Sequence, residues 1–242
     1  MKSDFKEAKI SILILAILLF VSVFICIFAA MFTSMGYKAY RNAVAERSDR
    51  AVIVLDPGHG GEDPGAVANG VSEKDINLDI ALRIRDMLSS CGYDVVMTRY
   101  DDRLLYGTGE EGKKKYFDLR NRVASVNGLE SPIFVSIHQN KFPAESCKGL
   151  QVFYSGNSEH SRLLADIIQE DARLLQPENR RSAKCGSETV YILEKLEIPA
   201  VLVECGFISN RREAELLSAE DYRESVAFSI FCSICRYLTE DI

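Results

Sequence analysis

The sequence predicts an α/β fold: a single domain with a largely parallel twisted sheet flanked by helices, preceded by one N-terminal transmembrane helix. Three observations predict it, namely short apolar runs that stop abruptly at polar residues, helical patterns between those runs, and a long uncharged segment near the N-terminus. Strand and helix patterns that alternate along a chain are typical of a parallel sheet covered by helices. The 242 residues suffice for one such domain and an appendage.

The expected appendage is the run Ile10–Tyr37, 28 consecutive residues without a charge. A helix of this length crosses a hydrocarbon core of about 30 Å. A cleaved signal peptide fits less well, because its apolar region has roughly 7–15 residues and ends at a small-residue cleavage site. We therefore expect a short tail at 1–9, a membrane anchor at 10–37, a linker at 38–50 and the domain at 51–242. The basic residues on both sides of the run leave its orientation open.

The charge of the domain argues against nucleic-acid binding. Residues 51–242 carry 22 Lys and Arg against 31 Asp and Glu, a net charge of -9. A nucleic-acid-binding domain would normally present a basic face. No internal repeat or low-complexity region is present.

Continuous runs of β-favouring apolar residues predict the strands. Ala51–Leu55, Pro132–Ile137 and Pro199–Val203 lack the polar alternation of a half-exposed strand, so each is expected to be buried on both faces. Val95–Thr98 and Leu150–Tyr154 predict two further strands. The first three runs end at DPGHGG, HQN and ECGF, respectively.

Apolar residues at helical spacing predict four helices. These are Asp75–Ser90, with Ser72 before it and Gly92 after it; Leu119–Val126, closed by Gly128; a helix capped by Asn157 that runs through Leu175; and Ala219–Leu238. Two polar stretches, Tyr100–Tyr116 with its Lys113–Lys115 run and Gln176–Glu188, interrupt the pattern. Each is by default a surface loop, although loops at one end of an α/β sheet often form a substrate groove.

Polar residues at the ends of the buried strands predict a metal site. Open α/β sheets bind ligands at the carboxyl ends of their strands, which brings His59, His138 and Glu204 to one edge. A catalytic zinc site typically has three protein ligands, such as two His and one Glu. Glu73, at the start of the first helix, is well placed as the third ligand, since the Gly-rich loop before it can fold back over the sheet. We therefore expect one Zn²⁺ per chain, held by His59, Glu73 and His138.

Glu204 is then free to act as the catalytic residue. A carboxylate beside such a metal can take the proton of an attacking water and pass it to a leaving amine, while the metal polarises the carbonyl. This set of groups is sufficient for amide hydrolysis.

Each of these residues also has a simpler interpretation. A His after a strand is usually a hydrogen-bonded polar residue, and a Glu in the first helical turn is favoured by the helix dipole. His160 is expected to be a solvated residue of this simpler kind. Cys205 with His138 as base would make a thiol nucleophile, but this leaves His59 and Glu73 without a task.

The remaining cysteines indicate no disulfide scaffold and no second metal site. The seven cysteines lack the dense, regular spacing of a disulfide framework. Cys232 and Cys235 form a Cys-x-x-Cys, but they lie within a predicted helix and no second pair completes a zinc site. They are expected to be packed thiols.

Six motifs in order carry a resemblance to a known family. They are LDPGHGG (Leu55–Gly61), GVSEKD (Gly70–Asp75), MTR (Met97–Arg99), DLRNRV (Asp118–Val123), FVSIHQN (Phe134–Asn140) and VLVECGFISN (Val201–Asn210). Together they resemble the zinc-dependent N-acetylmuramoyl-L-alanine amidases of the Amidase_3 type, over about Val52 to Tyr237. The family's zinc ligands fall on His59, Glu73 and His138 and its catalytic glutamate on Glu204. The resemblance implies hydrolysis of the amide between N-acetylmuramic acid and L-alanine in peptidoglycan.

A lone catalytic domain on an N-terminal anchor is similar, within this family, to the germination-specific amidases of spore-forming bacteria. That likeness implies removal of peptides from spore-cortex peptidoglycan so that muramic-δ-lactam forms, together with a separate deacetylase. It also implies a catalytic domain outside the cytoplasm and allows for an accessory exported protein, because the chain has no wall-binding module. Two residues depart from the family pattern: Gln139 replaces a small or apolar residue and Cys205 an aliphatic residue or Thr. A non-catalytic peptidoglycan-binding scaffold and a general vegetative wall amidase are the alternatives.

Overall fold

A computed structural model of the chain describes residues 19–20, 22–24 and 51–239. The chain divides into two units, Met1–Glu46 and Arg47–Ile242. Within the first, the described residues are helical and exposed. The predicted anchor at 10–37 lies largely outside the described residues, and the part of the chain that is described contains no helix long and apolar enough to span a membrane.

The centre of the second unit is a six-stranded sheet with the order β4-β1-β5-β8-β6-β7. The strands are β1 (Val52–Pro57), β4 (Asp94–Met97), β5 (Ile133–Asn140), β6 (Gln151–Tyr154), β7 (Lys184–Cys185) and β8 (Ala200–Phe207). β4, β1, β5 and β8 pair in parallel, whereas β6 is antiparallel to β8. The α/β class and the largely parallel sheet are therefore confirmed.

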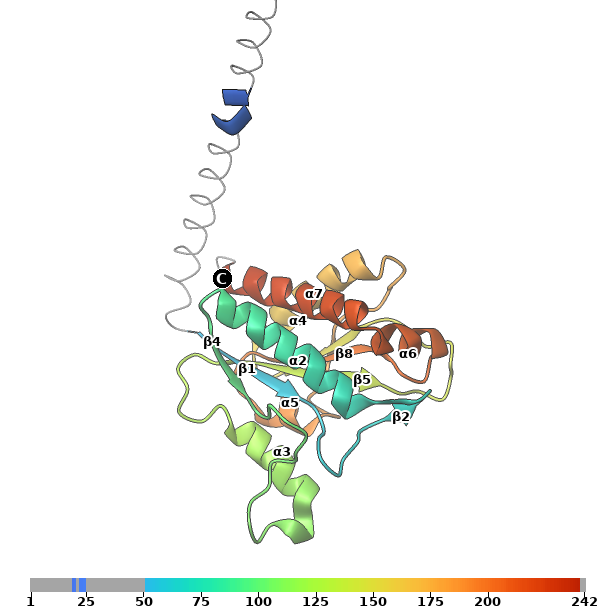
Figure 1. Cartoon of the computed structure of the whole chain (residues 1–242). Helices are drawn as coiled ribbons and strands as arrows, with labels where there is room; N and C mark the ends of the chain where they lie inside the picture. Colours follow the sequence, from blue (N-terminus) through green and yellow to red (C-terminus); the bar gives the residue numbers. More distant parts are fainter. Residues whose placement is uncertain (1–18, 21, 25–50, 240–242) are drawn as a thin grey trace, which may run out of the picture. The chain divides into compact units, whose positions relative to one another are not determined.

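Helices cover both faces of this sheet (Figure 1). They are α2 (Glu73–Ser90), α3 (Lys114–Ala124, preceded by the 3₁₀ turn η1, Glu111–Lys113), α4 (Glu159–Leu175), α5 (Tyr191–Lys195), α6 (Arg211–Ser218) and α7 (Glu220–Thr239). α7 packs against both α2 and α4 on one face, and α3 contacts α5 on the other. On the α3 and α5 side, Phe134, Leu193 and Leu202 belong to one buried apolar cluster. The sheet is thus the middle of three layers, as its fully buried strands require.

Two central strands are longer than the sequence predicts. β5 and β8 continue through their polar residues, so His138 and Glu204 lie within strands rather than after them. The two strands pair in register from Phe134 opposite Ala200 to His138 opposite Glu204. Backbone pairing between neighbouring strands extends the sheet past the point at which the apolar pattern stops.

The helix predictions are confirmed, apart from some boundaries and one cap. The second predicted helix starts at Lys114 rather than Leu119, within the stretch expected to be a loop. Asn157 does not cap α4: Ser158 is the N-cap residue, and the Asn157 side-chain amide donates to the backbone oxygens of Glu194 and Leu196. Asn157 therefore joins two segments that are distant in sequence.

A small hairpin before α2 was not predicted. It consists of β2 (Val67–Ala68) and β3 (Val71–Ser72), with Asn69 and Gly70 at positive φ in its turn. The Asn69 side chain donates to the backbone oxygen of Ile208, which follows β8. The hairpin is thereby fixed to the same sheet edge at which the polar strand residues lie.

Candidate active site

The strand β1 leads directly into the loop that carries His59. His59 lies two residues past the end of β1 and has a φ of 61°, an uncommon conformation for a residue other than glycine. Two buried arginines hold this loop by its backbone oxygens. Arg122 donates to Pro57 O at 2.8 Å and to His59 O at 2.7 Å, and Arg99 donates to Pro57 O and Gly58 O at 2.9 Å each. These contacts compensate for the unusual backbone and fix the direction of the imidazole.

Glu73 is the first residue of α2, and its carboxylate is almost fully buried. The backbone N–H groups of Ala66 and Gln139 donate to its two oxygens, at 2.7 and 3.1 Å respectively. Gly65, at a φ of 66°, leaves room for this arrangement, since a Cβ there would collide with both Glu73 and His59. The hairpin loop thus folds the carboxylate over the sheet edge.

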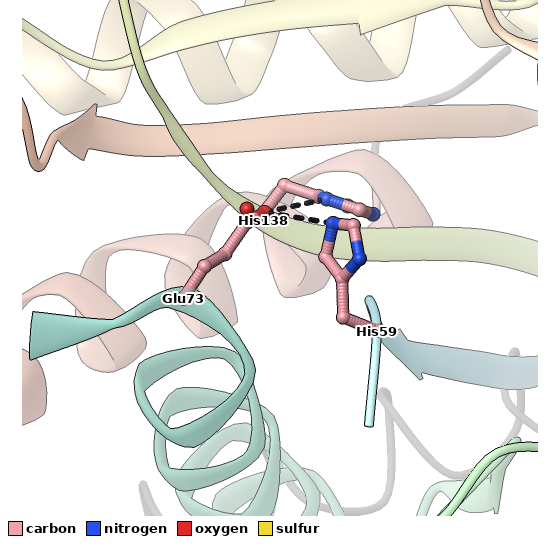
Figure 2. Close-up of side chains that lie close together, drawn as sticks. All are labelled: His59, Glu73 and His138. Atoms are coloured by element: carbon pink, nitrogen blue, oxygen red, sulfur yellow. Dashed lines mark hydrogen bonds and ion pairs between the residues drawn. The ribbon is translucent and has the colours of Figure 1, made fainter. Parts of the chain in front are cut away.

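The side chains of His59, Glu73 and His138 converge (Figure 2). Glu73 Oε1 lies 2.8 Å from His138 Nδ1 and 3.3 Å from His59 Nε2, and the two imidazole rings are 5.0 Å apart. One ligand atom from each residue lies within 4.8 Å of the others, so these three residues could hold a metal ion. The structure brings together the three residues for which the sequence predicts a metal site.

Hydrogen bonds and charge link the Glu73 carboxylate to both imidazoles. Burial raises the pKa of Glu73, but hydrogen bonds and charge from His138 and His59 outweigh it and hold this pKa well below its usual value. Burial lowers the pKa of His59, whereas Glu73 and Asp63 raise it by more. A divalent cation would replace protons held in this way, because metal binding to imidazole and carboxylate releases protons.

Asp63 orients His59 from the side opposite Glu73. Its Oδ2 lies 2.9 Å from His59 Nδ1, and its Oδ1 accepts from the backbone N–H of Gly65 at 3.1 Å. A carboxylate on Nδ1 keeps the proton there and leaves Nε2 free to bind, which is the usual arrangement behind a metal-ligating His. Asp63 had no predicted role, although its position four residues past His59 in a Gly-rich loop was a signal.

Glu204 lies beside this cluster, directly opposite His138 in the pairing of β5 with β8. Its Oε2 is buried and has no hydrogen-bond partner among the described residues. Burial raises the pKa of the Glu204 carboxyl to about 7, with His138 lowering it and Glu73 raising it further. An unpaired buried carboxyl with such a pKa is a candidate general acid or base.

A buried ion-pair network supports the whole loop, and its members were assigned no role from the sequence. Arg122 Nη1 lies 2.6 Å from Asp56 Oδ1, and Arg122 Nε lies 2.9 Å from Asp118 Oδ2. Asp56 also accepts from Thr98 and Ser136 at 2.6 Å each. Three of these side chains, Thr98, Asp118 and Arg122, belong to the motifs MTR and DLRNRV. The motifs could have drawn attention to these residues, but the sequence does not show which of their side chains point into the protein.

The residues that were given simpler interpretations are either exposed on another element or are thiols whose buried environment disfavours ionisation. His160 is exposed in the first turn of α4. Cys205 is fully buried and burial raises its pKa, which disfavours the thiolate that a nucleophile needs. Cys232 and Cys235 are free thiols within α7, and burial raises the pKa of Cys235 to about 12.

Comparisons with known proteins identify the family of this chain. The Amidase_3 profile, described as N-acetylmuramoyl-L-alanine amidase, matches residues 53–236. The germination-specific N-acetylmuramoyl-L-alanine amidase of Bacillus subtilis is 40% identical over 191 residues, which cover 78% of this chain and 80% of that protein.

Solved structures are similar as well. The CwlD amidase from Clostridioides difficile, solved in complex with the GerS lipoprotein, is 39% identical with a TM-score of 0.74, over 78% of this chain and 98% of that chain. The catalytic domain of the amidase CwlV from Bacillus (Paenibacillus) polymyxa var. colistinus is 30% identical with a TM-score of 0.66, over the same shares. With a family profile that spans most of the domain and relatives that share its sequence and fold, the chain belongs to the Amidase_3 family of N-acetylmuramoyl-L-alanine amidases.

Proposed function

We propose that this protein is a zinc-dependent hydrolase that cleaves the amide bond between N-acetylmuramic acid and L-alanine in peptidoglycan. The observation that carries the proposal is the convergence of His59, Glu73 and His138 beside the unpaired oxygen of Glu204. Ligand atoms within 4.8 Å of one another, two imidazoles and one carboxylate, fit the protein ligands of a catalytic zinc site. When bound, zinc would supply Lewis-acid polarisation of the scissile carbonyl and acidify a water.

Glu204 would transfer the proton in this reaction. Its ionised carboxylate, which a nearby cation would favour, can accept a proton from the attacking water and can then deliver that proton to the leaving amine of L-alanine. No described side chain or backbone N–H is hydrogen-bonded to its Oε2. The pairing of β5 with β8 places Glu204 directly opposite His138, one of the proposed zinc ligands.

Digestion of purified muropeptides with and without a chelator tests this function. We expect the intact protein to release stem peptides, the chelator to abolish release and added Zn²⁺ to restore it. Glu204→Gln should lower kcat by about 100-fold or more, since a positioned acid–base group contributes about 10²- to 10⁴-fold. Glu215→Gln, at an exposed carboxylate on α6, serves as the matched control. Equal cleavage by the Glu204→Gln variant and the parent would contradict the mechanism; binding without any cleavage by the parent would favour the scaffold alternative.

We further propose a role in spore-cortex maturation, in which peptide removal precedes muramic-δ-lactam formation by a pathway that includes a separate deacetylase. The similarity to a germination-specific amidase and to an amidase solved with a lipoprotein supports this role, including an accessory exported partner. Mass spectrometry of cortex muropeptides from a strain that lacks the gene tests it. Normal muramic-δ-lactam content would favour the general vegetative amidase instead.

The same proposal includes the location of the domain. Residues 10–37 would anchor the chain in a membrane, after a tail at 1–9 and before a linker at 38–50, with the catalytic domain at 51–242 facing the wall or the forespore cortex. Support comes from the 28-residue uncharged run and from the substrate, which lies outside the cytoplasm.

A further inference from the structure

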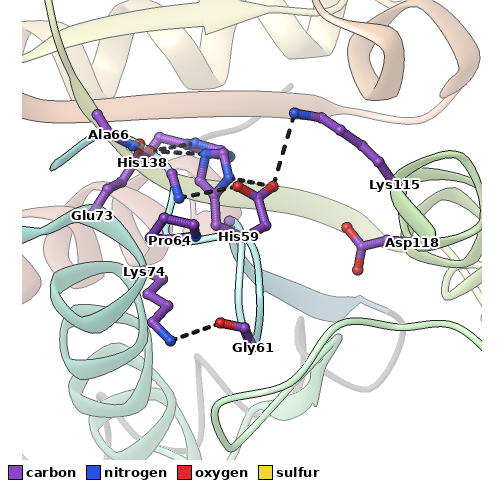
Figure 3. Close-up of polar contacts among 12 residues, drawn as sticks. His59, Gly61, Pro64, Ala66, Glu73, Lys74, Lys115, Asp118 and His138 are labelled. Atoms are coloured by element: carbon purple, nitrogen blue, oxygen red, sulfur yellow. Dashed lines mark hydrogen bonds and ion pairs between the residues drawn. The ribbon is translucent and has the colours of Figure 1, made fainter.

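The lysine run at the start of α3 lies next to the candidate active site. Lys115 Nζ is 3.9 Å from Asp63 Oδ2, the same oxygen that contacts His59 Nδ1 at 2.9 Å (Figure 3). The side chain of Lys115 is 77% exposed, and its distance to Asp63 is long for an ion pair. Because Asp63 is already engaged by His59, Lys115 retains its capacity to bind another carboxylate.

The backbone of this lysine is held in place by its neighbours. Lys114 Nζ binds Glu62 at 2.6 Å, which joins the start of α3 to the His59 loop. Asp118 Oδ1 accepts from the backbone N–H of Leu105 at 2.7 Å, and Asn121 donates to Leu105 O at 2.6 Å. These contacts tie the start of α3 to the segments around His59, and Lys115 extends from α3 toward Asp63 and His59 (Figure 3).

Other lysines near this loop are already occupied. Lys74 Nζ binds Gly61 O at 2.8 Å and Asp102 at 2.6 Å, and Lys114 is paired with Glu62. The domain has a net charge of -9, so an anionic substrate gains from an exposed cation near the candidate site. Lys115 is in a position to supply it.

The stem peptide of the proposed substrate carries a carboxylate within reach. The residue after L-alanine is a D-glutamate linked through its side chain, which leaves its α-carboxyl either free or amidated. In an extended dipeptide this group lies about 7 Å from the scissile nitrogen, at roughly 3.3–3.6 Å per residue. On the basis of the proposed function, we propose that Lys115 binds the carboxylate of the second stem-peptide residue and makes the enzyme prefer stem peptides in which that carboxylate is free.

Two muropeptides that differ only in this group, α-carboxylate or α-amide, test the proposal with the full-length, zinc-loaded protein. The parent should have a lower KM for the free carboxylate. Lys115→Ala should raise that KM about two- to fivefold, the range of an exposed ion pair, and should leave kcat and the KM of the amidated substrate unchanged. Lys115→Arg should retain the preference and Lys115→Glu should reverse it.

Lys113→Ala is the matched control, because Lys113 belongs to the same run, is exposed and ends η1. Binding of both muropeptides in a Glu204→Gln background provides a readout that does not depend on turnover. The Lys115 proposal alone is overturned if the parent cleaves both substrates with equal KM, or if Lys115→Ala affects both equally. If the parent cleaves neither substrate, the proposed amidase function is contradicted, and the proposal for Lys115 is contradicted with it because it rests on that function.

Discussion

The raised pKa of Glu204 has its origin in a buried environment in which one carboxyl oxygen has no hydrogen-bond partner among the described residues. Most buried carboxylates in this protein are compensated: Asp56 by Arg122, and Glu73 by two histidines and two backbone N–H groups. Glu204 has an oxygen without a partner among the described residues, and burial raises its pKa to about 7. The folded protein therefore loses stability when this group ionises, a cost typical of functional sites.

This cost predicts a pH dependence of stability in the metal-free protein. The Glu204 pKa is about 7 when folded against 4.5 for an ordinary glutamate, so the stability contribution is fully present below about pH 4.5 and is lost as pH rises through 7. The loss corresponds to about 3 kcal/mol at most. Thermal unfolding of the apoprotein should show that Glu204→Gln gains stability relative to the parent between pH 5.5 and pH 8, by about 2 kcal/mol. A Gln variant with the same pH profile as the parent would contradict the assigned pKa shift; Glu215→Gln should follow the parent.

Asp63 should control zinc affinity through His59. In Asp63→Asn, the side-chain oxygen can still accept from the Gly65 N–H, which turns the amide nitrogen toward His59 Nδ1 and favours the tautomer that blocks Nε2. We expect zinc affinity to fall about 10- to 100-fold, as for other groups behind a metal-ligating His. Competition with a chromophoric chelator measures it, and Glu62→Gln, a neighbouring exposed carboxylate, is the control. An unchanged zinc affinity in Asp63→Asn would mean that Asp63 stabilises only the backbone of the loop, through the Gly65 N–H, and does not affect metal binding by His59.

The juxtaposition of His59, Glu73 and His138 could be predicted from the sequence because parallel strands end at one edge and only a few side chains there can bind a metal. The side chains that position these three residues could not be predicted from the sequence. Arg99 and Arg122 are fully buried. Because arginine is exposed in most proteins, the residue type alone predicts that both side chains lie at the surface. Only the fold reveals that both side chains turn toward the backbone oxygens of the β1 loop.

At the scale of elements, the sequence predicted the central strands and the long helices but missed the short pieces. β5 and β8 reach beyond their apolar runs because the two strands still pair at His138 with Glu204 and, after a register shift, at Asn140 with Phe207. The hairpin β2–β3 has two residues per strand, too few for a periodic pattern, and depends on the bond from Asn69 to Ile208 O. Long-range contacts of this kind leave no local signal.

The link between α3 and the β1 loop should dominate the stability of this part of the fold. Arg122→Met removes a buried cation that contacts Asp56, Asp118 and the loop backbone, and leaves two buried carboxylates without compensation. We expect unfolding free energy to fall by about 3–5 kcal/mol, as when one partner of a buried pair is removed. Urea denaturation measures the change. Arg120→Met, at an exposed position of the same helix, should change it by less than about 0.5 kcal/mol; similar losses in both variants would show that the ion pairs are not the cause.

At the scale of the whole molecule, the charge distribution fits a tethered enzyme. Residues 1–50 carry 7 Lys and Arg against 4 Asp and Glu, whereas the domain is acidic. An acidic body is repelled by an anionic membrane surface, so an apolar anchor rather than charge would have to hold the domain near a bilayer. The proposed anchor at 10–37 would supply that attachment.

Charged substitutions within the uncharged run test that attachment. Phe20→Arg combined with Phe24→Arg places two guanidinium groups inside 10–37, and each costs about 2.5–3.5 kcal/mol near the centre of a membrane helix. We expect the full-length protein to sediment with membranes and to resist alkaline carbonate extraction, and the double variant to be released. Phe20→Leu with Phe24→Leu, which keeps the run apolar, should behave as the parent. Membrane retention of the Arg variant would argue against an anchor at 10–37, and a mature N-terminus downstream of residue 37 by mass spectrometry would identify the run as a cleaved signal instead.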